Sequence, residues 1–203
     1  MRLLLDNDVF CKLGVGKLLD DTLVVLGAGI GDCGRLPALP YMLRKGRLPK
    51  TYGAEACVGL VAVAKKMKPI PAPQATWLDR LTSVQAIDAG EAQLFALAAQ
   101  DSLIVVTGDK RALLALKDID GYAEALAGRI VVLEAILLAL CDRLGHAEVR
   151  RRLGSLTTSD ATLKVCFSAS NPDPRTGLES YYRSLVDEVR PLRLWERPGG
   201  KSA

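Results

Sequence analysis

The feature that most constrains this fold is the alternation of short apolar runs with helix-like segments. Apolar runs at residues 2–5, 103–107 and 129–133 each precede a stretch with helical apolar spacing or strong helix formers. Strands that alternate with helices form βαβ units, with helices on both faces of a parallel sheet. We therefore expect an α/β domain over residues 1–154. The pattern then stops, which predicts a helical C-terminal extension over residues 155–203.

Further helices are expected from apolar periodicity, helix-forming composition and proline placement. They lie at residues 35–43, 52–66, 76–81, 89–100 and 177–189.

Composition excludes several classes of protein. The 203 residues are 49% hydrophobic with a net charge of +4, and no apolar run approaches the roughly 20 residues of a membrane span. Without a signal-peptide pattern at the start, a soluble cytoplasmic protein with no membrane partner is expected. Five scattered cysteines suggest buried small hydrophobes in a reducing compartment. Because His146 is the single histidine, catalysis should depend on carboxylates or a bound cofactor.

Three acidic residues occupy comparable places in this predicted fold. Asp6 and Asp109 each follow a strand, and Glu91 lies in the first turn of the helix before residues 103–107. The carboxyl ends of parallel strands open on one edge of the sheet, where α/β proteins place their sites. Carboxylates gathered there repel one another unless a cation lies between them, and oxygen ligands suit magnesium or manganese.

Helix capping is an alternative explanation for the same acids. Asp88 and Glu91 have the spacing of a capping box, and Asp8 and Asp109 stand where an N-cap is expected. The two explanations remain open.

Three segments together resemble the ordered acidic motifs of PIN-domain ribonucleases across residues 1–134. They are LLLDNDVF at 3–10, DAGEAQLFALA at 88–98 and LIVVTGDKRAL at 103–113. The resemblance implies a three-layer α/β/α nuclease fold and an endoribonuclease that hydrolyses RNA with magnesium or manganese. It carries over Asp6, Glu91 and Asp109 as metal ligands, with Asp8 and Thr107 as supporting catalytic residues.

The resemblance also implies one more metal-binding acid, on a helix between the first two motifs. Glu55 is the candidate, since it is the only acid from Gly34 to Pro73. We expect Glu55 to lie partly buried beside an apolar helix face. There it serves either as a metal ligand or in an ion pair with Lys50 or Arg47.

Charge is distributed unevenly along the chain. Residues 44–68 carry seven basic residues and one acid, whereas residues 69–141 carry five basic and nine acidic residues. This polarity suits an RNA backbone that binds a basic face and is cut at an acidic notch. A solvated helix face would explain the same charges. The predicted RNA contacts are Arg44, Lys45, Lys65, Lys66 and Lys68.

Two other functions compete with the ribonuclease. Gly29 to Gly34 form a G-x-G-x-x-G motif between the apolar run 22–26 and the predicted helix at 35–43, a pattern that would suit a dinucleotide-binding oxidoreductase. A PIN-like scaffold that binds RNA or protein without cutting is the second alternative. A protein partner such as an antitoxin, a processing role and a homodimer all stay open.

Overall fold

The five strands in the described part of the chain form one all-parallel sheet. The computed structural model describes residues 1–156, 161–167 and 174–196. Within them the strand order is β3-β2-β1-β4-β5. The strands are β1 (Leu3–Leu5), β2 (Cys33–Arg35), β3 (Lys68–Pro69), β4 (Ile104–Thr107) and β5 (Ile130–Val132).

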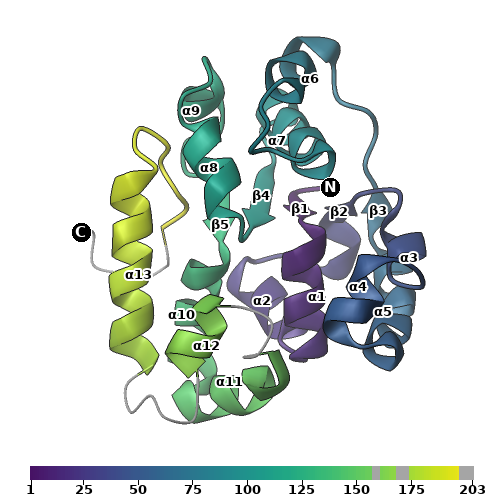
Figure 1. The fold of residues 1–203 in the computed structure, drawn as a ribbon, viewed down its shortest axis with the longest axis vertical. Helices are drawn as coiled ribbons and strands as arrows, with labels where there is room; N and C mark the ends of the chain where they lie inside the picture. The colour runs from purple at the N-terminus through teal and green to yellow at the C-terminus, as the bar shows by residue number, and fades with distance from the viewer. Residues whose placement is uncertain (157–160, 168–173, 197–203) are drawn as a thin grey trace.

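Helices join successive strands and flank the sheet (Figure 1). They are α1 (Asn7–Val15), α2 (Leu19–Val25), α3 (Leu39–Met42), α4 (Arg47–Tyr52), α5 (Ala54–Lys66), α6 (Ala75–Thr82), α7 (Ala89–Asp101), α8 (Lys110–Leu116), α9 (Tyr122–Ala125), α10 (Leu133–Leu144), α11 (His146–Leu153), α12 (Ala161–Phe167) and α13 (Pro174–Glu188). Two 3-10 turns lie at Ile30–Asp32 and Gly154–Leu156.

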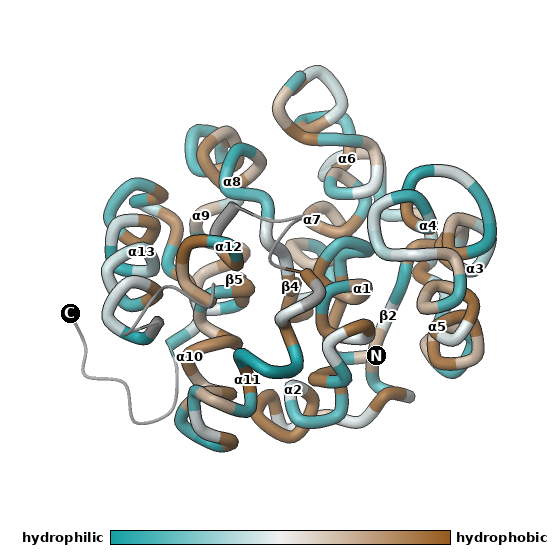
Figure 2. The backbone as a smooth tube through the Cα atoms, turned by 60° about the horizontal axis from the view of Figure 1, so that its bottom comes forward, coloured by the Kyte–Doolittle hydropathy of each residue, from teal (hydrophilic) through white to brown (hydrophobic). Residues whose placement is uncertain are grey.

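The period of two along each strand builds a separate core on each face of the sheet. Leu3 and Leu5 of β1 enter the core formed with α1, α2, α5 and α10, whereas Leu4 enters the core formed with α6, α7, α8 and α9. Figure 1 shows these two groups of helices on opposite sides of the strands. In Figure 2 hydrophobic and hydrophilic residues alternate around these helices, as expected for amphipathic elements that flank a sheet.

The structure confirms the three predicted strands and corrects details between them. It adds β2 and β3, which the sequence analysis did not predict. The predicted helix at 35–43 shrinks to α3, because Arg35 still belongs to β2. The predicted helix at 52–66 begins later, because Gly53 separates α4 from α5 with a φ of +91° that favours glycine.

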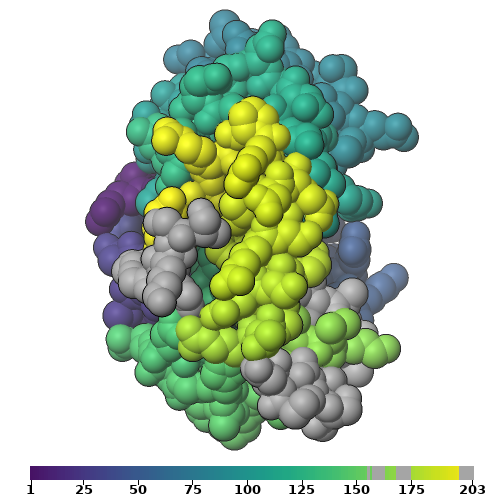
Figure 3. Space-filling view, turned by 90° about the vertical axis from the view of Figure 1, so that its left-hand side faces the viewer, coloured from purple at the N-terminus to yellow at the C-terminus, as the bar shows by residue number. Residues whose placement is uncertain are grey.

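The C-terminal region shares the hydrophobic cores of the sheet. Leu178 of α13 lies in the first core, and Leu185 and Val189 lie in the second. After α13 the chain returns to the open edge of β5, where the Trp195 amide donates to the Ile130 carbonyl at 2.8 Å. Figure 3 shows α13 covering this side of the molecule. The predicted extension is therefore helical over α12 and α13 and then returns to β5 without helix, and its residues 157–160, 168–173 and 197–203 lie outside the described part.

Two compositional expectations can be compared with the structure. All five cysteines are buried, as predicted. No helix in the described ranges combines the length and the apolar character needed to cross a bilayer.

Candidate functional site

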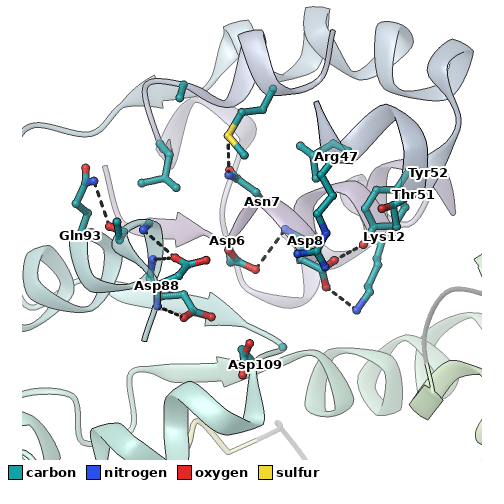
Figure 4. Close-up of a pocket in the computed structure, with 18 of the residues that line it drawn as sticks. Asp6, Asn7, Asp8, Lys12, Arg47, Thr51, Tyr52, Asp88, Gln93 and Asp109 are labelled. Carbon is teal, nitrogen blue, oxygen red and sulfur yellow. Dashed lines mark hydrogen bonds and ion pairs between the residues drawn. The ribbon is translucent and has the colours of Figure 1, made fainter. Parts of the chain in front are cut away.

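A cleft of about 920 Å³ opens at the carboxyl edge of the sheet. Asp6 enters it directly after β1, and Asp109 enters it just beyond β4, the neighbouring strand. Asp88 and Glu91, at the start of α7, complete an acidic wall. Figure 4 shows Asp6, Asp88 and Asp109 around the same opening. Parallel topology thus brings together the three predicted acids and adds Asp88, which the sequence analysis had assigned only to capping.

Asp6 is held by the first turn of α1. Asp6, and not Asp8 as predicted, is the N-cap of this helix, because the helix already begins at Asn7. Asp6 Oδ2 accepts a hydrogen bond from the Asp8 amide at 3.2 Å. Burial and the charges of Asp8 and Asp88 raise the pKa of Asp6 to about 6, although the amides of Asn7 and Asp8 oppose this shift. An ionised Asp6 is therefore costly without a nearby cation.

Asp88 and Glu91 form the capping box predicted from their spacing. Asp88 Oδ1 accepts from the amides of Gly90 and Glu91 at 2.8 Å, and Glu91 Oε2 accepts from the Asp88 amide at 2.8 Å. Glu91 is only 8% exposed. Its burial, together with the charges of Asp109, Asp88 and Asp6, raises the pKa of Glu91 to about 8 despite the stabilising Asp88 amide. Glu91 therefore experiences the charge of every other acid on this wall.

Asp109 is the N-cap of α8 and carries the opposite pKa shift. Burial alone would raise its pKa, but hydrogen bonds from the Ala112 amide and the Arg111 side chain outweigh burial and lower it. The Arg111 guanidinium lies 3.2 Å from Asp109 Oδ2. Thr107 does not line the cleft; its buried Oγ1 accepts from the Asp109 amide at 3.2 Å. Thr107 thus fixes the turn that presents Asp109.

The chemistry of this donor set fits a hard cation, but its arrangement is not that of a closed metal site. The cleft offers carboxylate and amide oxygens without histidine or cysteine, as magnesium and manganese prefer. Within the described residues, however, no three acidic, histidine or cysteine side chains gather closely enough to hold one ion. Capping bonds and the Arg111 ion pair engage these carboxylates instead.

Asp8 lines the cleft beside the acidic wall and is already compensated. Its Oδ1 accepts a hydrogen bond from the Tyr52 hydroxyl, and its Oδ2 lies 2.5 Å from the Lys12 ammonium. The Lys12 side chain is 9% exposed and the Asp8 side chain 47%, so only the lysine end of this ion pair is shielded from water. Figure 4 shows Asp8, Lys12 and Tyr52 as one linked group. The group joins α1 to α4 and fixes the end of the cleft away from Asp109.

Glu55 is not brought to this cleft. It lies exposed in the first turn of α5, and the buried face of that helix is formed instead by Cys57, Leu60, Val61 and Ala64. The expectation of a partly buried Glu55 is therefore wrong. None of the ion pairs in the described part of the chain joins Glu55 to Lys50 or to Arg47.

The predicted basic residues divide between the two edges of the sheet. Arg44 and Lys45 lie in the exposed connection from α3 to α4, whose ends at Met42 and Arg47 line the cleft. Lys65 and Lys66 end α5, just before β3 begins at Lys68. Since β3 is parallel to β2, these lysines precede the strand and lie toward the edge opposite the cleft.

The glycine motif does not have the context of a dinucleotide fingerprint. Such a fingerprint connects a strand to a following helix. Here the preceding apolar run belongs mainly to α2, and Gly34 lies within β2. The motif therefore runs from a helix into a strand, which is the reverse order.

Comparisons of the chain with protein-family models, curated proteins and solved structures find no match.

Proposed function

We propose that this chain is a PIN-like, metal-dependent endoribonuclease, with magnesium or manganese held by Asp6, Glu91 and Asp109. The observation that carries the proposal is the meeting of these acids, from three separate elements, in one cleft. Their charges act on one another, because the pKa of Glu91 is raised by both Asp109 and Asp6. A divalent cation would relieve this repulsion and favour the ionised acids.

The cleft also offers the charges that RNA cleavage requires. A bound magnesium or manganese ion would supply Lewis acidity and a water of lowered pKa for attack on the phosphodiester. Arg47 on the opposite wall, with Arg44 and Lys45 beside it, can bind the phosphates that flank the cut. No histidine is needed in this scheme.

One observation favours a second function, in which the same cleft binds RNA or protein without cutting. The acids are engaged as helix caps and in an ion pair, and the described residues contain no assembled group of three metal-binding side chains. A scaffold that retained the acids only for capping would have this arrangement.

Cleavage of labelled single-stranded RNA, with manganese or with excess chelator, separates the two functions. We expect cleavage only with manganese, and its loss in Asp6→Asn and in Asp109→Asn. Asparagine is as good an N-cap as aspartate, so both variants should keep their helices and melt close to the parent. Loss of cleavage without loss of stability would therefore identify a role other than capping.

Glu55→Gln is the matched control, since it removes an acid that the structure places outside the cleft. We expect this variant to cleave at the rate of the parent with an unchanged manganese requirement. Cleavage that persists in chelator, or in both aspartate variants, would contradict the proposal. RNA binding without cleavage in any condition would support the second function.

A further inference from the structure

The wall of the cleft that faces the acids has a different chemistry. Leu36, Met42 and Leu48 give it an apolar surface, and Arg47 adds a single cation. Leu36 and Leu48 are each 8% exposed, so they are fixed in the core and present only their edges. Ligand pockets have this character, with mostly apolar walls and a few polar groups that set specificity.

Asn7 lies in the cleft between the acids and this apolar wall, with an unusual hydrogen-bonding state (Figure 4). The residue is 8% exposed, and its Oδ1 is buried without a hydrogen-bond partner in the described structure. Its Nδ2 donates only to the Met42 thioether at 3.6 Å, a weak acceptor. A buried amide oxygen left without a donor typically costs about 1–3 kcal/mol. The fold therefore buries the Asn7 amide oxygen at a place where no described group donates a hydrogen bond to it.

To contact a ligand, the Asn7 amide would turn its Oδ1 toward the cleft. Its terminal torsion has broad minima, and the one hydrogen bond that the described structure gives its Nδ2, to Met42, is weak. Turning would offer an acceptor and a donor side by side. This is the pair that recognises adenine, whose amino group donates while the adjacent ring nitrogen accepts.

We propose that this wall is a nucleobase subsite and that Asn7 selects adenine next to the phosphate that a metal ion bound at the acids would hold. The inference rests on the proposed action on RNA and names the base that the same cleft takes. A purine would pack its face on Leu36 and Met42, and the Arg47 guanidinium would bind the adjoining phosphate. The nearby cations Arg44 and Lys45 favour a nucleic acid over an apolar peptide as the occupant.

The test is the affinity of the full chain for four short homopolymeric RNAs, measured by fluorescence anisotropy in excess chelator so that none is cut. We expect oligo(A) to bind roughly tenfold more tightly than oligo(U) or oligo(C), as one two-pronged amide contact provides. Asn7→Leu and the isosteric Asn7→Asp should each abolish that preference. Asn7 is poorly bonded, so at least one variant should fold, which its melting temperature verifies.

Arg47→Gln is the matched control on the same wall. It should weaken binding of all four RNAs by a similar factor and keep the preference for oligo(A), because a phosphate contact carries no base information. Equal affinity for the four RNAs, or a preference that survives in a folded Asn7 variant, would overturn the inference. Cleavage is scored separately with manganese, so the ribonuclease proposal can fail while base selection stands, and the reverse also holds.

Discussion

Glu91 accepts a capping hydrogen bond in surroundings that disfavour its ionised form. It completes the capping box of α7, yet it is buried among acids that raise its pKa from 4.5 to about 8. Between these values the folded protein keeps a proton that the unfolded chain releases. The contribution of Glu91 to the free energy of unfolding is therefore fully present below pH 4.5 and is lost as the pH rises toward 8. Asp6 contributes with the same sign between its ordinary pKa of 3.8 and about 6.

We therefore predict that, in chelator, the free energy of unfolding falls as the pH rises from about 5 to about 8. Glu91→Gln should flatten this decline, because glutamine still completes the capping box but does not titrate. Urea denaturation at a series of pH values measures the effect. Glu124→Gln, which removes an exposed acid on α9, is the control and should follow the parent. A Glu91→Gln curve as steep as that of the parent would show that Glu91 does not carry the pH dependence.

The sequence predicted which acids meet in the cleft wherever an acid directly follows a recognisable strand and that strand pairs with the next one. Asp6 and Asp109 follow strands that pair with each other, so the sheet brings them to one edge. Asp88 was assigned to capping alone, although its place one turn before Glu91 was a usable signal. Asn7 directly follows Asp6, so its place at this edge could have been predicted too, whereas the place of Arg47 depends on the packing of α4 against α1. No local pattern encodes that packing.

The strands that contain apolar runs could be predicted from the sequence, whereas β2 and β3 could not. β1 and β5 consist of buried aliphatic residues, and β4 consists of three aliphatic residues followed by the buried Thr107. β2 reads Cys-Gly-Arg and β3 reads Lys-Pro, with both β3 residues exposed. These short strands exist because the sheet extends by pairing with β1 and then with β2, which is a non-local cause.

The C-terminal extension contributes side chains to both cores of the sheet. A chain that ends at Gly154 would lose Leu163, Phe167 and Leu178 from one core, and Leu185 and Val189 from the other. Burial of one such side chain contributes about 1.5–3 kcal/mol, so the loss of these five is comparable to the whole stability of a typical domain, roughly 5–15 kcal/mol. We predict that this truncated chain does not fold cooperatively.

Far-ultraviolet circular dichroism on heating, together with soluble yield, measures this outcome. A chain that ends at Glu196 is the control and should melt cooperatively, because it keeps α13 and the Trp195 bond to β5. If the chain ending at Gly154 melted as one sharp transition near the temperature of the control, the extension would be a dispensable addition to the fold.

The fold separates the two ends of the basic segment 44–68, which is continuous in the sequence. Helix α5 starts beside Tyr52 at the cleft and runs back toward the opposite edge of the sheet, so it separates the charges at its two ends. Arg44, Lys45 and Arg47 remain on the cleft side, whereas Lys65, Lys66 and Lys68 follow the helix away. Composition could show the excess of positive charge but not this division, which depends on the direction of one helix.

Two triple variants of equal charge test which basic group contacts RNA. Changing Arg44, Lys45 and Arg47 to glutamine should lower the salt dependence of binding by up to about two units, since each phosphate contact on a single strand contributes roughly 0.7. The same change at Lys65, Lys66 and Lys68 should leave the slope nearly unchanged. Both variants lose the same net charge, so a difference between them must come from position.

The slope is read from the affinity for a short single-stranded RNA at several salt concentrations in chelator. Equal losses in the two variants would mean that RNA passes along both edges of the sheet, and a loss confined to the lysine variant would move the binding face away from the cleft.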